Sequence, residues 1–236
     1  ADISWLMYHE LGHANDFFPP SSWSQLSVNR SPLETSNLAS MSPDSDALDS
    51  TFPLRSDEMH ALAQVNFGGN DATNEQQDIT PENVVNYFTP DLATGFYNYY
   101  TTREDYATLF EKFMMKYRLD ADSDIAIVAR DNNPEYLVTW GQRNRFNAPA
   151  LQERVLFTVN RVLPEIDARL IQMSLPAPQS MRDNISWFDN LNLSSAAKNT
   201  VQNNQTSFWQ NDTLTAQQIK QDIRNPHLHK AHSLKQ

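Results

Sequence analysis

Two histidines lie four residues apart near the start of the chain, and a glutamate follows the first: His9-Glu10-Leu11-Gly12-His13. Residues i and i+4 of a helix lie on one face, one turn apart, so both imidazoles can reach one metal ion at about 2.0–2.1 Å. Glu10 then projects beside the ion, where a carboxylate can take a proton from a bound water. The alternative is a helix with two hydrogen-bonded histidines. The spacing favours a zinc site with Glu10 as general base.

A catalytic zinc site needs a third protein ligand and an open fourth position. The chain has no cysteine, and the residue six positions after His13 is Pro19, so neither a thiolate nor that position can supply the ligand. Three of the other four histidines lie in the C-terminal tail, at positions 227, 229 and 232. An acid on a second helix is therefore favoured, and Glu104 is the candidate because the helix it opens is apolar on its opposite face. An ordinary first-turn glutamate, favoured by the helix dipole, is the alternative.

The elements that carry these residues can be read from the periodicity of the sequence. Residues 3–18 are typical of a helix that is apolar on more than one face, so we expect it to be buried. Residues 19–56 are rich in Ser, Pro, Asn and Asp, which predicts a long polar surface loop with short helical turns. Further helices are expected at 57–67, after the cap Ser56, and at 81–88, after the cap Thr80.

The second half of the chain predicts a helix, a hairpin and further helices. Residues 102–117 have a strongly apolar face at helical spacing, and the β-rich runs 125–130 and 135–140 predict a small β-hairpin. Residues 149–172 predict one or two helices interrupted near Pro164, and 175–236 a polar C-terminal extension that includes a helix at 215–224. No repeat or linker divides the chain. We therefore expect one mainly α (α+β) domain over residues 1–236.

Composition excludes several classes of protein. With 236 residues the chain can bury a sizeable core. Its formal net charge of −11 argues against nucleic acid or an anionic membrane surface as the main partner. No apolar run approaches the roughly 20 residues that a membrane-spanning helix needs. The absence of cysteine excludes disulfide frameworks, iron–sulfur clusters and thiol catalysis.

Two segments resemble the motifs of zincin metallopeptidases that use a glutamate ligand, and are most similar to those of the anthrax lethal factor-like catalytic domains. The first is HELGHAND, and in the second Tyr97 stands seven residues before Glu104, which is followed by Asp-Tyr-Ala. The resemblance implies a zincin-like helical fold and a Zn²⁺ ion held by His9, His13 and Glu104. It also implies that Glu10 is the general base and that Tyr97 stabilises the oxyanion or donates a proton. Tyr100 is the second candidate for that tyrosine.

The chain departs from the family pattern at two places. The family carries another acid four residues after the ligand glutamate, where this chain has Thr108. Its first motif helix also follows a small sheet lobe, whereas almost nothing precedes residue 3 here. We therefore expect the sequence to be the C-terminal part of a longer chain, or the wall of the cleft to be built differently. Asp16 is expected to orient His13 or a neighbouring backbone group, or else to be an exposed aspartate at the helix end.

The expected function is that of a zinc-dependent metallopeptidase acting on a peptide or protein. The alternatives are a catalytically silent zincin-like binding module and a metallohydrolase that acts on a cell-wall substrate. The lack of cysteine, the acidic composition and the resemblance to secreted proteases predict an exported bacterial protein, extracellular or periplasmic. Cleavage specificity and oligomeric state are not predicted.

Overall fold

The computed structural model describes residues 2–31, 34, 42–129 and 136–191. The chain divides into two compact units, residues 1–187 and 188–236. The helices of the first unit, with 3₁₀ helices written η, are α1 (Asp2–Phe17), η1 (Pro20–Gln25), α3 (Asp44–Thr51), α4 (Asp57–Asn66), α5 (Asn74–Gln77), α6 (Pro81–Phe88), η2 (Phe96–Tyr99), α7 (Thr102–Leu119), η3 (Arg145–Asn147), α8 (Gln152–Val162) and α9 (Ala168–Ser174). Its strands are β1 (Asp124–Ala129), β2 (Leu137–Arg143) and β3 (Gln179–Ser180). A last helix, α10 (Trp187–Leu191), begins at the final residue of this unit.

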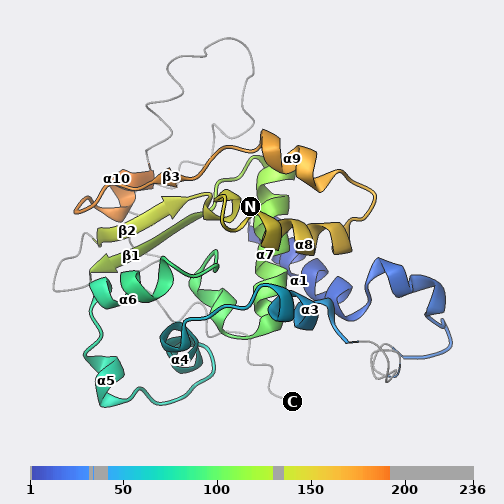
Figure 1. Ribbon diagram of the computed structural model, residues 1–236, viewed down its shortest axis with the longest axis horizontal. Coiled ribbons are helices and arrows are strands. Elements are labelled where there is room, and N and C mark those ends of the chain that lie inside the picture. Colours follow the sequence, from blue (N-terminus) through green and yellow to red (C-terminus); the bar gives the residue numbers. More distant parts are fainter. Residues whose placement is uncertain (1, 32–33, 35–41, 130–135, 192–236) are drawn as a thin grey trace, which may run out of the picture. The chain divides into compact units, whose positions relative to one another are not determined.

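The first unit is mainly helical with a small antiparallel sheet, as the sequence predicted (Figure 1). The expected helix starts are confirmed by their caps. The Ser56 hydroxyl accepts a hydrogen bond from the Met59 amide at 3.2 Å, and Thr80 does the same for Asn83 at 3.3 Å. The helices expected within 149–172 are α8 and α9, separated around Pro164.

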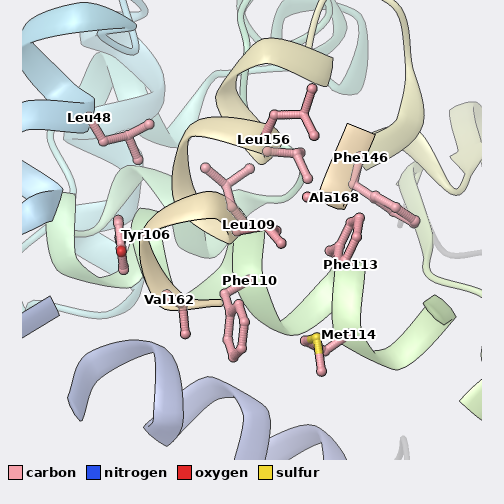
Figure 2. Packing of buried hydrophobic residues seen from close by; sticks show 12 residues of the cluster. Leu48, Tyr106, Leu109, Phe110, Phe113, Met114, Phe146, Leu156, Val162 and Ala168 are labelled. Atoms are coloured by element: carbon pink, nitrogen blue, oxygen red, sulfur yellow. The ribbon is translucent and has the colours of Figure 1, made fainter. Parts of the chain in front are cut away.

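Helix α7 is the centre of the first core, and α1, α3 and α8 all pack against it. Its apolar face supplies Leu109, Phe110 and Phe113, which meet Leu48 of α3 and Val159 of α8 (Figure 2). All five side chains are almost completely buried. The apolar periodicity of residues 102–117 therefore marks the face that packs against α3 and α8.

A second core lies between α4, α6, η2 and the sheet. Met59, Phe88 and Tyr99 are buried in it, with Trp140 of β2 packed against them. The strand order is β1-β2-β3, antiparallel throughout, with a bulge between Ile127 and Val128. The predicted hairpin is confirmed, although its second strand runs over 137–143 instead of 135–140. The third strand is two polar residues long and has no alternating pattern that could predict it.

A buried ion pair ties the start of α7 to the rest of the first unit. Arg154 is fully buried and pairs with Asp105, while its guanidinium also donates to the carbonyls of Phe52 at 2.9 Å and Leu92 at 3.0 Å. The Asn98 amide donates to Asp105 at 2.7 Å. Because both charges lie out of water, each depends on the other and on these hydrogen bonds for stabilisation.

Helix α1 is only partly buried, whereas the sequence predicted a buried helix. Ile3, Leu6 and Met7 are 77%, 50% and 57% exposed. The sequence is apolar around more than one face, and α7 covers one of them while the opposite face lies open. The prediction of a buried helix was therefore wrong for this face.

The two segments expected to be polar and irregular contain more structure than predicted. Residues 19–56 include η1 and α3, and α3 packs on α7 through the fully buried Leu48. In the expected extension 175–236, β3 pairs with β2. The helix expected at 215–224 and the histidines at 227, 229 and 232 lie outside the described residues. Among the helices that are described, none has both the length and the apolar character needed to cross a bilayer.

We predict that Arg154→Met destabilises the protein by about 3–5 kcal/mol, since it leaves the Asp105 charge buried without a partner. The matched control is Arg169→Met. Arg169 pairs with Glu153, but both side chains are about 60% exposed, so the loss is expected to stay below about 1 kcal/mol. Urea unfolding of both variants measures the difference. Equal losses would show that the buried pair does not anchor α7.

Candidate metal centre

The candidate site forms where α1 and α7 touch. A Cβ atom added at Gly12 would lie 2.8 Å from the Ala107 Cα and 3.2 Å from its Cβ, which is closer than packed atoms allow. Glycine therefore permits a separation between the two helices that a larger residue would prevent. At this crossing the histidines of α1 face the first turn of α7. There Thr101 caps the helix by accepting a hydrogen bond from the Glu104 amide at 3.2 Å.

Three potential ligand atoms converge at this crossing. His9 Nε2 lies 3.0 Å from Glu104 Oε2, His13 Nε2 lies 3.2 Å from the same oxygen, and the two Nε2 atoms are 3.2 Å apart. His9 is buried, and His13 and Glu104 are partly buried. The structure thus brings together the three residues that the sequence proposed as ligands, including the glutamate far along the chain.

The triangle has the dimensions of a metal site. Ligand atoms about 2.0–2.1 Å from a tetrahedral zinc ion lie about 3.3–3.4 Å from one another, close to the 3.0–3.2 Å edges observed. Two imidazole nitrogens and a carboxylate oxygen offer lone pairs to one point, an arrangement that a cation stabilises. His9, His13 and Glu104 can therefore hold a metal ion, and this donor set fits zinc.

A second acid fixes the orientation of His9. Glu111 Oε2 lies 3.1 Å from His9 Nδ1, and the Glu111 carboxylate is buried. With Nδ1 donating to Glu111, the lone pair of Nε2 points at the candidate ion. The family that the sequence resembles would carry an acid where this chain has Thr108, whose buried hydroxyl has no hydrogen-bond partner among the described residues. The sequence analysis did not predict that Glu111 orients His9, although Glu104 and Glu111 are seven residues apart and so share a helix face.

Electrostatics couple the histidines to the carboxylates. Burial disfavours a charged imidazole, but hydrogen bonds with Glu104 and Glu111 outweigh it and raise the pKa of His9 from 6.5 to about 9. Burial likewise disfavours ionised Glu104, and hydrogen bonds from His13 and His9 overcome it and lower the pKa of Glu104 to about 2. In the metal-free protein His9 thus carries a proton at the place where a metal cation would bind.

Of the two candidate tyrosines, Tyr97 lies at the cluster. Its hydroxyl feels the charge of the Glu104 carboxylate, and its ring stacks on His9 with the ring centroids 6.0 Å apart. Tyr100 stacks on the Tyr97 ring at 5.9 Å, and it makes no hydrogen bond or ring contact with any of the three potential ligands, all of which lie in the described part of the chain. Burial, the charge of Glu104 and, more weakly, that of Glu10 raise the pKa of Tyr97 above its ordinary value. The phenol therefore keeps its proton and can donate a hydrogen bond.

Glu10 is exposed and lies on the uncovered apolar face of α1. Ile3, Leu6, Met7 and Glu10 follow the i, i+3, i+4, i+7 spacing of a single helix face. Its charge influences the Tyr97 hydroxyl, so the carboxylate and the phenol act on the same region. Glu10, the predicted general base, is thus exposed to solvent on a helix face that also carries apolar side chains.

Asp16 and His60, the third histidine among the described residues, have structural contacts. Asp16 is fully buried and accepts a hydrogen bond from the Ser45 amide at 2.6 Å, in the first turn of α3. It therefore joins α3 to α1, as the backbone alternative predicted, and is not exposed at the helix end. His60 Nδ1 lies 2.9 Å from the carbonyl oxygen of Tyr99, which holds α4 against η2.

Comparison with known proteins gives no match to this chain among protein-family models, curated proteins or solved structures. Its function is therefore inferred from the chemistry of the site.

We predict that Glu111→Ala weakens zinc binding about 10–100-fold while the protein still takes up one ion at saturation, because His9 is then free to turn. Glu104→Ala is expected to remove tight binding, since it deletes a ligand. The exposed Glu82→Ala on α6 is the control and should bind zinc like the wild type. Competition titration against a zinc-sensitive chelator measures all three. Tight zinc binding by Glu104→Ala, with none by Glu111→Ala, would reverse the two roles.

We predict that the metal-free protein becomes less stable as the pH rises from 6.5 through 9. The native state holds a proton on His9 that the unfolded chain releases near pH 6.5, so its stabilisation is complete below that pH and is lost above about 9. Urea unfolding with a chelator at pH 6 and pH 9.5 measures the change. His9→Gln should show a smaller change, and an identical pH dependence in both proteins would contradict the assignment.

Proposed function

We propose that this protein is a zinc-dependent metallopeptidase with a zincin-like catalytic domain. The observation that carries the proposal is the convergence of His9 Nε2, His13 Nε2 and Glu104 Oε2 within 3.0–3.2 Å of one another. Glu10 follows the first of these residues in the HELGH sequence, and the ring of Tyr97 stacks on that of His9. A site with three protein ligands leaves one position open, as catalytic zinc requires.

A bound zinc ion would polarise the scissile carbonyl group and lower the pKa of a coordinated water to about 7. The Glu10 carboxylate accepts the proton of the attacking water and then passes it to the leaving nitrogen. The Tyr97 hydroxyl donates a hydrogen bond to the carbonyl oxygen as negative charge develops there. Its raised pKa supports this role, because the group stays protonated through the working pH range. Glu111 keeps His9 in the orientation that binds the metal.

The surroundings of Glu10 support a polypeptide substrate. Exposed Ile3, Leu6 and Met7 lie on the same helix face as the carboxylate. Burying this apolar surface against apolar parts of a peptide is favourable. The basic residues that a nucleic-acid surface would need are in the minority, since 29 acidic residues outnumber 18 basic ones. The proposal extends to an exported bacterial enzyme, which the cysteine-free acidic sequence supports.

We predict that Glu10→Gln lowers kcat/KM for peptide hydrolysis at least about 100-fold, since it removes the general base, and leaves zinc binding intact. The exposed Glu82→Gln on α6 is the control and should keep full activity. The assay uses a peptide library together with a muropeptide library. Full activity in Glu10→Gln with zinc bound would exclude this mechanism. Activity on muropeptides alone would indicate a cell-wall hydrolase, and zinc binding without any turnover a silent module.

We predict that Tyr97→Phe lowers kcat about 100–1000-fold with little change in KM, because the lost hydrogen bond forms mainly in the transition state. Tyr100→Phe is the matched control, and it should change kcat by less than tenfold. Steady-state kinetics on the best peptide from the library measure both variants. A larger loss in Tyr100→Phe would assign the role to Tyr100 instead.

A further inference from the structure

A pocket away from the metal centre is lined by residues of α4, α6 and β1. Its volume is about 580 Å³, within the range of roughly 300–1,000 Å³ that is typical of small-molecule sites. The walls come from all three elements: Met59 and Leu62 on α4, Val84 and Phe88 on α6, and Ile125 and Ile127 on β1. The pocket thus lies in the second core, and none of its lining residues belongs to the candidate active site.

The chemistry of the lining restricts what can bind. Among the lining residues, all of which lie in the described part of the chain, none is charged, and the polar side chains are the carboxamides of Asn66 and Gln76. A charged ligand would lose its hydration there without gaining a counter-charge. An apolar ligand would instead release water from apolar walls. The lining therefore fits an uncharged, mainly apolar molecule with one or two hydrogen-bonding groups.

The walls are held in place independently of any ligand. The His60 ring and the Gln64 amide attach α4 to η2 through the carbonyls of Tyr99 at 2.9 Å and Tyr100 at 2.8 Å. On the sheet side, Phe88 packs edge-on against Trp140 with centroids 5.5 Å apart. A pocket between elements fixed in this way is already formed when a ligand arrives, so binding does not have to overcome a large ordering cost.

Aromatic residues separate the pocket from the metal centre. Phe96 lines the pocket, and its ring lies 5.2 Å from that of Phe67. Phe67 in turn contacts Tyr97, with the centroids 4.8 Å apart, and Tyr97 stacks on His9. None of the three potential metal ligands lines the pocket. Occupancy of the pocket can therefore be measured without zinc and without peptidase activity.

We propose that this pocket binds an uncharged, mainly apolar small molecule at a site distinct from the metal centre. The inference does not rest on the metallopeptidase proposal, because none of its lining residues takes part in that chemistry. An apolar side chain of a peptide is the competing occupant, and the experiment distinguishes it.

The experiment titrates the full chain, first zinc-free and then zinc-loaded, with the neutral dye 1-aminoanthracene, and then displaces the dye with straight-chain alcohols from hexanol to decanol. We expect one saturable dye site in both forms and alcohol affinities that rise about fourfold per added methylene. Carboxylates of the same chain lengths at pH 8 should displace the dye at least about tenfold more weakly, since the lining offers no cation. Equal displacement by alcohols and carboxylates would overturn the proposal, as would stronger displacement by apolar peptides.

Two variants that fill the pocket test whether the dye binds there. Val84→Phe places a larger side chain in the pocket and should weaken dye binding at least about tenfold. The matched control Val28→Phe makes the same change at a residue that is 100% exposed, and should leave the affinity unchanged within about twofold. Leu62→Phe fills the pocket from α4 and serves if Val84→Phe fails to fold, as judged by circular dichroism. Wild-type affinity in a folded Val84→Phe or Leu62→Phe protein would show that the dye binds elsewhere.

Discussion

The contact between Gly12 and Ala107 sets the geometry on which the candidate metal centre depends. The ligand atoms come from two helices that are far apart in the sequence, and an imidazole and a carboxylate reach one point only when the helix axes are close. Glycine at the crossing allows this approach, and the small Ala107 opposite it leaves the required space. The apolar core behind α7 then holds that helix in place, so the packing of the first unit determines the distances between potential ligands.

Helix α7 has two kinds of surface that serve different purposes. One face carries Glu104, Thr108 and Glu111 toward the histidines, and the other packs apolar residues against α3 and α8. Two buried carboxylates beside one imidazole would repel each other in the absence of positive charge. A shared proton balances them in the metal-free state, and a metal cation would do so more fully. The same arrangement thus accounts for the raised pKa of His9 and for the expected affinity for zinc.

Local patterns in the sequence predicted the features that depend on neighbouring residues. The HELGH spacing predicted the two histidines that meet at the candidate site, and the caps Ser56 and Thr80 predicted helix starts, because these signals act within one or two turns. Glu104 was reached through the absence of cysteine together with a family resemblance. The contact of Glu111 with His9 depends on how two distant helices cross, which no local pattern encodes. The exposed face of α1 was missed for a similar reason: hydrophobicity shows that a face can be buried, and only tertiary packing decides whether another element covers it.

Glu104 and Asp105 are adjacent in the sequence but point to different partners, the first to the histidines and the second to Arg154. Each residue of a helix is rotated about 100° from the one before. The core contacts of Leu109 and Phe110 fix the rotation of α7, so a residue inserted or deleted between Asp105 and Leu109 would turn both carboxylates by about 100°. Glu104 would then leave the histidines and Asp105 would leave Arg154 in the same step. The metal centre and the buried ion pair therefore depend on one helix register.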